Sequence, residues 1–434
     1  MRQWLRDGVQ VLFTQGPKAF ARGVQRVLRR ELAARNGEAT AAAAAMQAPA
    51  QWPMLCWHLE SPDPTQPPAD PARLDVRGWI AAVGDIEYVR FADARVARAL
   101  DITLAPRPDV TAAYGMAATG FSASAPYEAG SQPATLALEF AVAGRKHEIV
   151  VPAYRPPTDV AALKRAKLER LRGVLQCPSC GSRTLDESPA SLQCRHCSAV
   201  FPRSETALDF LTPELRAAFD IVPTDNVSSN SYDGEALNII HRLRDGLVLD
   251  CGAGLRDRYF GNVVNYEIVP YATTDVLGVG ERLPFADAAF DAVFSFAVLE
   301  HVKDPFACSR ELLRVLKPGG TLYCQVPFLQ PVHGYPHHYY NMTATGMRNL
   351  FGDAIEVERM GTFLFGQPVF ALSWILNRYA QGLPPGAREE FTAMKVGDLL
   401  EPGNKYLAAP FVTALAEATR EELSCCNGLI ARKR

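Results

Sequence analysis

The spacing of apolar residues changes several times along the chain, and each change marks a different kind of predicted structure. In residues 1–36, apolar side chains such as Trp4, Leu12 and Phe20 recur at roughly helical spacing, among a clear excess of Lys and Arg. A basic amphipathic helix of this kind can lie on an anionic membrane or dock on a partner, and an ordinary helix that covers a core shows the same pattern. The low-complexity stretch that completes residues 1–51 is typical of a linker.

Between residues 52 and 154 the pattern shortens to alternating apolar and polar positions. The segments LDVRGWIAAV, IEYVRFAD, TLALEFAVAG and HEIVVPAY are each bounded by Pro, Gly or Asp, which predicts a small β-sandwich-like domain. The phrases RGWI, RPDVTAAYG and TGFSASAP resemble a β-rich accessory domain that accompanies glycosyltransferases and methyltransferases of bacterial polysaccharide gene clusters. A docking or spacer domain without a ligand is the alternative interpretation.

From residue 225 to residue 434, buried strands and amphipathic helices alternate. The segment LVLDCGAG (247–254) places an apolar strand before a glycine turn, and ELLRVLKPGGTLYCQVPF (311–328) gives a helix, a second glycine turn and another buried strand. This alternation predicts a parallel sheet with helices on both faces, an α/β fold. Residues 155–213, which contain a charged helix and two cysteine pairs, connect this region to the β-rich one.

The composition is that of a packed and nearly neutral protein, with 434 residues, 48% hydrophobic residues and a net charge of -2. The length predicts two or three domains. The charge balance argues against strong nucleic-acid binding. No run of about 18 apolar residues occurs and the N-terminus shows no secretory signal, so we expect a cytoplasmic protein. The basic N-terminal helix is the candidate contact with the inner membrane or with a glycosyltransferase.

Four of the ten cysteines fall in two CxxC pairs, CPSC and CRHC, separated by 13 residues. Each pair bends the chain so that two thiolates can meet one ion, and four thiolates leave no open coordination position. We therefore expect a structural zinc ion, with a rubredoxin-type iron centre as the alternative, bound by Cys177, Cys180, Cys194 and Cys197. The stretch LQCRHCSAVFPRSETALDFL resembles the zinc-ribbon module that precedes or partners several methyltransferases, which implies a supporting role or a contact with substrate.

The glycine turn that follows LVLD is the first candidate binding site. Gly252 and Gly254 allow a ligand to approach the backbone closely, and Asp250 before the turn disfavours a phosphate and favours a cationic ligand. Glu267 ends the next predicted strand, where its carboxylate is placed to accept hydrogen bonds from ribose hydroxyls. A glycine turn alone is weak evidence, because ordinary tight connections have the same composition.

The motifs LDCGAG, LPF…FDAVFS…LEHV and RVLKPGG occur in an order and spacing that resemble the class I S-adenosylmethionine-dependent methyltransferases. The resemblance implies a seven-stranded, Rossmann-like, mostly parallel sheet whose last strand is antiparallel, and LSCCNGLIARK (423–433) is the candidate terminal strand. It also implies that Glu300 and His301 open the helix after the fourth strand.

The resemblance assigns binding of S-adenosylmethionine to residues at the ends of the strands. The methionine part is assigned to Asp250, Gly252 and Gly254, and the ribose to Glu267. Adenine is assigned to the backbone around Val279 and Gly280. The floor of the cofactor site is assigned to Phe296 and Ala297. Two positions depart from the family pattern. Arg256 replaces the third glycine of the turn, and Val279 replaces an acid that contacts adenine.

Histidines and tyrosines cluster in LQPVHGYPHHYYNMT (329–343), where substrate enters in the implied fold. Histidine is the best general base near neutral pH, and tyrosine offers sugars a stacking and hydrogen-bonding surface. The phrase HGYPHHYYNMT also resembles an HxxPxDYxRxT phrase of methyltransferases near polysaccharide loci. The predicted catalytic candidates are His333, His337, His338 and Tyr339.

The function predicted from these observations is O-methylation of a sugar, glycan or lipid-linked saccharide in bacterial surface polysaccharide biosynthesis. A zinc-ribbon methyltransferase acting on ribosomal or transfer RNA is the alternative, and six Lys or Arg against two acids over residues 155–172 are its best support. A third interpretation is a non-catalytic scaffold with the methyltransferase fold, which Arg256 and Val279 motivate.

Overall fold

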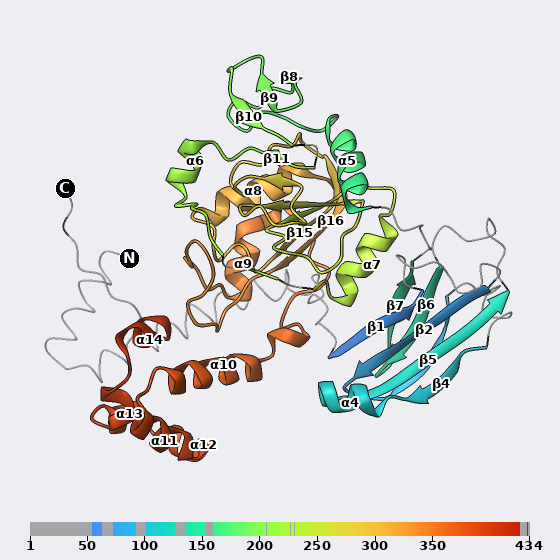
Figure 1. Ribbon diagram of the computed structural model, residues 1–434. Helices are drawn as coiled ribbons and strands as arrows, with labels where there is room; N and C mark the ends of the chain where they lie inside the picture. The colour runs from blue at the N-terminus through green and yellow to red at the C-terminus, as the bar shows by residue number, and fades with distance from the viewer. Residues whose placement is uncertain are drawn as a thin grey trace, which may run out of the picture. The chain divides into compact units, whose positions relative to one another are not determined.

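The computed structural model describes residues 54–62, 73–92, 101–126, 136–152, 159–204, 206–225, 227–229, 231–425 and 432 (Figure 1). The predicted basic helix and linker at 1–51 lie outside these residues, so the expected contacts of this region stay predictions. Among the described residues, no helix is both long enough and apolar enough to span a bilayer.

The β-rich region folds into two antiparallel sheets that share one apolar core. One sheet has the order β1-β2-β5-β4 and the other β3-β6-β7. The elements are β1 (Leu55–Ser61), β2 (Arg73–Ala82), β3 (Ile86–Phe91), β4 (Thr103–Pro106), α4 (Pro108–Tyr114), β5 (Ala117–Pro126), β6 (Leu136–Val142) and β7 (Arg145–Val151). Alternation along the strands brings side chains of both sheets into this core, among them Ile80, Phe121, Phe140 and Ile149.

A six-stranded sheet with the order β11-β14-β13-β12-β15-β16 forms the centre of the second half (Figure 1). All of its strand pairs are parallel. The strands are β11 (Leu208–Asp209), β12 (Val248–Cys251), β13 (Val263–Glu267), β14 (Val276–Leu277), β15 (Phe290–Phe296) and β16 (Leu316–Gln325). The predicted α/β class is therefore confirmed.

Helices cover both faces of this sheet, which explains why its strands are apolar on both sides. On one face, Val248 packs with Ala236 and Ile240 of α7 (Gly234–Arg242). On the other, Leu249 shares a core with Cys308 and Leu312 of α8 (Pro305–Val315). A strand buried on both faces needs a continuous apolar run, and the residues LVL before Asp250 provide it.

The end of the domain differs from the expected seven-stranded sheet with an antiparallel last strand. The described residues after β16 form helices: α9 (Ala344–Phe351), η1 (Gly352–Ala354), η2 (Leu364–Gly366), α10 (Pro368–Gln381), α11 (Pro385–Ala393), α12 (Val396–Leu399), η3 (Gly403–Tyr406), α13 (Pro410–Thr413) and α14 (Glu417–Glu422). Prolines open the first turn of α10, α11 and α13, where their missing N–H costs nothing. In the expected terminal strand, 423–425 are not extended, and 426–431 lie outside the described residues.

The cysteine-containing segment is built into the same core as the sheet. It comprises α5 (Val160–Leu171), the antiparallel strands β8 (Leu185–Glu187), β9 (Ser191–Cys194) and β10 (Val200–Pro202), and α6 (Pro213–Ala218). Leu175 forms an antiparallel bridge with Phe285, and Cys177 and Phe201 belong to the core that contains Leu249. The four cysteines therefore lie on a support that is continuous with the six-stranded sheet.

Two lysines of α5 are buried against the edge of this sheet. Lys167 Nζ donates to Asp275 Oδ2 at 2.7 Å and to the Tyr259 hydroxyl at 2.5 Å, and Lys164 Nζ donates to the Thr274 carbonyl at 2.6 Å. Neither lysine therefore contributes to a basic surface. This burial weakens the feature that best supported RNA as a substrate.

Candidate functional site

The glycine turn after β12 has the backbone conformation that its sequence predicts. Gly252 has φ 76° and Gly254 has φ 64°, values that side chains rarely allow. A Cβ atom at Gly252 would lie 2.3 Å from Val298 Cγ2, and one at Gly254 would lie 2.6 Å from the Ser228 carbonyl oxygen. Both glycines are required by a turn that is packed closely on two sides.

Asp250 at the end of β12 forms a buried ion pair with Arg256. Arg256 Nε and Nη2 donate to Asp250 Oδ2 at 2.9 and 2.8 Å, and the Tyr232 hydroxyl donates to the same oxygen at 2.5 Å. The guanidinium carbon of Arg256 also lies 4.2 Å from the centre of the Tyr232 ring. Asp250 Oδ1 is buried and has no hydrogen-bond partner among the described residues. The sequence indicated a cationic ligand for Asp250. It did not indicate that the guanidinium group of Arg256 is a cation that pairs with Asp250.

Glu267 ends β13, and Val279 follows the end of the neighbouring strand β14. Glu267 Oε2 accepts from the Gly254 N–H and Oε1 accepts from the Ile268 N–H, each at 3.0 Å, and burial raises the pKa of this carboxyl. Val279 belongs to an apolar cluster with Leu211 and Ile221. Its carbonyl accepts a hydrogen bond from the Tyr266 hydroxyl at 2.9 Å, and a Cβ atom on the following Gly280 would meet Cys308 Sγ at 2.7 Å.

The two residues expected to form the cofactor floor, Phe296 and Ala297, mark the end of β15. Phe296 is half-buried, with its ring centre 4.6 Å from that of Tyr323. Ala297 adopts a positive φ of 54° and donates from its N–H to the Gln325 carbonyl at 2.9 Å. The chain leaves the sheet here and runs as a loop to α8, which begins at Pro305. Glu300 therefore lies in this loop and not, as expected, at the start of a helix.

Glu300, His301 and His333 converge beside this loop, with one ligand-type atom of each within 4.8 Å of the others. The Glu300 side chain is 0% exposed, and neither of its oxygens has a hydrogen-bond partner among the described residues. Burial raises the pKa of Glu300 to about 8 and lowers the pKa of His301 to about 4. The sequence motifs assigned neither Glu300 nor His301 to a site. The signal available was the LEH motif, but its proximity to His333 depends on the tertiary fold.

The structure separates the predicted catalytic residues into two groups. The rings of His333 and His338 lie 4.6 Å apart, and the ring of His301 is 5.2 and 5.3 Å from them. His337 points elsewhere, because its Nε2 pairs with Asp220 Oδ2 at 2.9 Å. Tyr339 is 37% exposed and donates from its N–H to the Glu300 carbonyl at 2.7 Å.

The loop that carries these histidines is tied to the segment after α6. The Tyr335 hydroxyl accepts from the Val222 N–H at 2.7 Å and donates to the Val222 carbonyl at 2.5 Å. Together with the contact between His337 and Asp220, these bonds join the loop to residues 220–222. The same segment contributes Ile221 to the cluster around Val279. The loop at 329–343, called the histidine loop below, and the expected adenine region are therefore structurally connected.

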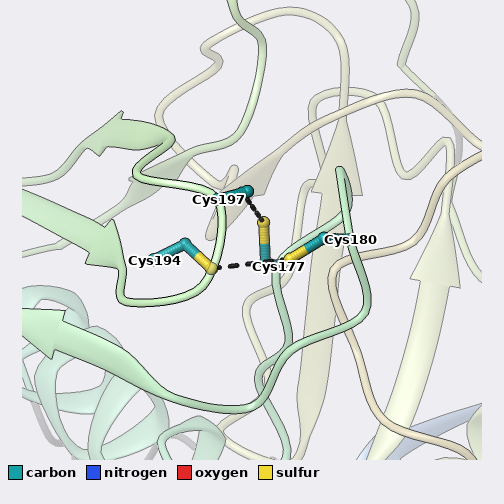
Figure 2. A group of neighbouring side chains, drawn as sticks. All are labelled: Cys177, Cys180, Cys194 and Cys197. Atoms are coloured by element: carbon teal, nitrogen blue, oxygen red, sulfur yellow. Dashed lines mark hydrogen bonds between the residues drawn. The ribbon is translucent and has the colours of Figure 1, made fainter.

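The four cysteines of the two CxxC pairs converge on one point (Figure 2). The distances from Cys177 Sγ to Cys197 Sγ and from Cys180 Sγ to Cys194 Sγ are both 3.6 Å, and all four sulfurs lie within 4.8 Å of one another. Zn–S bonds of about 2.3 Å in a tetrahedron separate the sulfurs by about 3.8 Å. The four thiols thus have the spacing of a tetrahedral metal shell.

The two CxxC turns share one backbone pattern. In each, the N–H of the first cysteine donates to the carbonyl five residues later, at 2.8 Å for both Cys177 and Cys194. The residue four positions after that cysteine donates back to it and has a positive φ, 74° at Gly181 and 59° at Ser198. The sequence predicted that the turns would converge, and this repeated geometry explains how they do so.

A parallel α/β sheet that carries a glycine turn and acidic side chains at its carboxyl edge is the arrangement in which such folds bind nucleotide-like cofactors. Residues 250–324 match the family described as "Methyltransferase domain". The chain therefore contains a methyltransferase domain, as its motifs predicted.

Individual relatives carry the same name. An uncharacterized methyltransferase of Schizosaccharomyces pombe is 44% identical over 63 residues, which are 14% of this chain and 23% of that protein. One of Mycobacterium sp. strain KMS is 36% identical over 81 residues, 18% of this chain and 29% of the relative. The matches thus span less than a third of either relative. The crystal structure of the [4+2]-cyclase SpnF aligns with 47% of this chain and 85% of its own at 18% identity, with a TM-score of 0.21, too low to establish a shared fold.

Proposed function

We propose that this chain is an S-adenosylmethionine-dependent methyltransferase that methylates a hydroxyl group of a sugar, glycan or lipid-linked saccharide. The observation that carries the proposal is the unpaired oxygen of Asp250, buried beside the glycine turn of a methyltransferase domain. The sugar acceptor rests on the aromatic and imidazole groups of His333, His338 and Tyr339 at the same edge of the sheet. Burial of Lys164 and Lys167 counts against RNA as the acceptor.

The residues at the glycine turn fit the methionine and ribose parts of the cofactor. Asp250 Oδ1 is available for the ammonium group, because Arg256 and Tyr232 engage only Oδ2. The carboxylate of Glu267 lies beside the turn and is assigned to the ribose. When bound, S-adenosylmethionine supplies an electrophilic methyl group on a sulfonium centre.

The adenine part requires a rearrangement. The Val279 side chain is 3% exposed because it is packed in a cluster with Leu211 and Ile221. An adenine ring that contacts Val279, as the family resemblance implies, must displace this part of residues 211–222. The apolar surface exposed in this way, which includes Ile268 and Leu277, suits the face of a purine ring.

The chain's own contribution to methyl transfer is alignment of the acceptor. A hydroxyl oxygen must approach the methyl carbon in line with its bond to sulfur, and such positioning supplies several kcal/mol. The histidine loop is held in place by His337 and Tyr335, which bond to residues 220–222. His333, His338 and Tyr339 are then presented to the acceptor from a fixed loop.

Calorimetry with S-adenosylhomocysteine on the full chain tests the cofactor assignment. We expect binding by the wild-type protein and at least about tenfold weaker binding by Glu267→Gln, since an amide replaces a carboxylate that accepts several hydrogen bonds. Glu356→Gln, at an exposed position, is the matched control. Absence of binding to the wild-type protein would refute the proposed activity.

The acceptor is tested by transfer of a labelled methyl group from S-adenosylmethionine. Oligosaccharides and lipid-linked sugars form one panel, and transfer and ribosomal RNA form the other. Methylation of members of the first panel supports the proposal. Label incorporated only into RNA would overturn the sugar acceptor while leaving the methyltransferase activity in place.

We further infer that the four cysteines hold a structural zinc ion, supported by their tetrahedral spacing and by the burial of Cys177 and Cys194 in the shared core. Metal analysis of the purified chain should give one zinc atom at this site. Cys177→Ser should lose it, because a neutral hydroxyl is a poor zinc ligand. Cys425→Ser, at an exposed cysteine outside the cluster, should retain it. Iron with thiolate absorption in the visible range would instead identify a rubredoxin-type centre.

A further inference from the structure

We propose that Glu300, His301 and His333 form a binding site for one divalent transition-metal ion, distinct from the four-cysteine site. The carboxylate provides the first argument. Glu300 is completely buried, and its two oxygens lack hydrogen-bond partners among the described residues. Its neighbouring polar atom in the cluster is His301 Nε2, 3.7 Å from Oε1, too far for a hydrogen bond. Burying a carboxylate without a partner is costly, and a cation at this point removes the cost.

The two histidines are oriented as metal ligands are. His301 Nδ1 lies 2.8 Å from the His337 carbonyl oxygen, and His333 Nδ1 lies 2.8 Å from the Pro331 carbonyl oxygen. A carbonyl oxygen only accepts, so each Nδ1 must carry the hydrogen, and the lone pair is left on Nε2 of both rings. A backbone carbonyl that fixes the tautomer in this way is the usual outer support of a metal-bound imidazole.

The neighbouring His338 is excluded from the site by its own bonds. Its Nδ1 accepts from the His333 N–H at 3.3 Å, and its Nε2 pairs with Asn341 Oδ1 at 3.0 Å. His338 therefore forms a wall of the site instead of ligating. His337 is also excluded, since its ring pairs with Asp220.

The backbone around the cluster is shaped to hold the three side chains together. Gly334 has φ 82°, and a Cβ atom there would lie 2.3 Å from Cε1 of the His301 ring. Only glycine lets this loop pass so close to His301. The N–H groups of Tyr339 and Tyr340 donate to the Glu300 carbonyl at 2.7 and 3.2 Å, which binds the loop to the Glu300 backbone.

The ligand set indicates which ion is bound and what it can do. Two imidazoles and one carboxylate suit Mn²⁺, Fe²⁺, Co²⁺ or Zn²⁺, and three protein ligands leave coordination positions open. Val298, two residues before Glu300, packs against Gly252, so the site adjoins the glycine turn. An ion here can bind acceptor oxygens and lower the pKa of a hydroxyl. This role rests on the proposed function, whereas the binding of the ion does not.

Titration with Mn²⁺, followed by the loss of the free-ion electron paramagnetic resonance signal, tests the site. Mn²⁺ is chosen because thiolates discriminate against it, so the cysteine site does not compete. The full chain is first dialysed against a chelator too weak to remove thiolate-bound zinc. We expect one bound Mn²⁺ per chain, and affinity at least about tenfold lower in Glu300→Gln and in His333→Gln.

His58→Gln is the matched control, because it removes an exposed histidine of β1 that belongs neither to the cluster nor to the loop that carries His333. Its Mn²⁺ affinity should equal that of the wild type. Mn²⁺ should also raise the thermal midpoint of the wild type and of His58→Gln but not of Glu300→Gln, which separates lost binding from lost folding. No uptake of Mn²⁺ by the wild type, or unchanged affinity in both site variants, would overturn the proposal. Neither result affects the calorimetry with S-adenosylhomocysteine. The proposed metal site and the proposed methyltransferase activity can therefore be refuted separately.

Discussion

Arg256 occupies the position at which the resembled glycine turns carry a third glycine, and its guanidinium engages one oxygen of Asp250. Both side chains are nearly inaccessible, with 2% and 0% of their surfaces exposed. The pair explains how a carboxylate can be buried at the end of β12 in this chain. In the proposed binding mode, the pair leaves only the other oxygen of Asp250 for the ammonium group of the cofactor.

The main effect of replacing Arg256 should therefore be a lower free energy of unfolding. Arg256→Met leaves Asp250 buried with Tyr232 alone, and removal of one partner of a buried ion pair costs about 3–5 kcal/mol. Urea unfolding measures this loss. The double variant Asp250→Asn/Arg256→Met should recover much of it, because no charge is left unpaired. Strictly additive losses in the two single variants and the double variant would contradict the coupling.

At the scale of elements, residues 211–222 have two contacts that bear on function. Ile221 packs on Val279 at the edge of the sheet, and Val222 bonds to Tyr335 in the histidine loop. The two contacts are made by consecutive residues, so we expect a change in one contact to affect the other. The segment after α6 thus links the expected adenine region to the loop that carries His333 and His338.

Cofactor binding should be visible in this segment by hydrogen exchange. If adenine displaces Leu211 and Ile221 from Val279, S-adenosylhomocysteine should increase deuterium uptake in 211–222 while it protects the glycine turn at 252–254. Peptides from the β-rich region, residues 136–151, are the internal control and should not change. Protection of 211–222 would show instead that the cluster stays closed over the bound cofactor.

At the scale of the whole molecule, the cysteine segment and the methyltransferase domain share one core. Cys177 and Cys194 are buried in the same cluster as Leu249 and Phe285. Strand β11 follows the cysteine segment and pairs with β14 at the edge of the large sheet. The four-cysteine cluster is therefore coupled to the packing of the sheet through continuous apolar contacts.

Removal of the proposed zinc ion should consequently destabilise the methyltransferase domain as well. We expect a strong chelator to shift the calorimetric transition of the large sheet to lower temperature, because metal binding to the native state contributes to folding free energy. The antiparallel sheets of the β-rich region, which have a core of their own, serve as the comparison. An unmoved transition of the large sheet would show that the two parts are energetically independent.

Local patterns alone were sufficient for several features. The apolar run before Asp250, the glycines at positive φ and the two CxxC turns depend on residues within a few positions of one another, where sterics and spacing decide the outcome. The antiparallel last strand expected at 423–433 is not formed by the described residues 423–425, for a related reason. A short apolar run such as that near residue 425 does not distinguish a strand from a loop or helix until its neighbours are known.

Other features depended on contacts between residues far apart in the sequence, which single-sequence patterns do not contain. The basic residues Lys164 and Lys167 resemble a solvated helical face until Asp275 and Thr274 are placed beside them. The sequence predicted that Glu300 begins a helix. Only the tertiary structure brings His333 next to the buried carboxylate of Glu300. The sequence by itself determined the α/β class, the glycine turn and the cysteine shell, because these follow from local geometry. The tertiary structure alone decided which charges are paired and which remain unpaired, because burial and partnership are properties of packing.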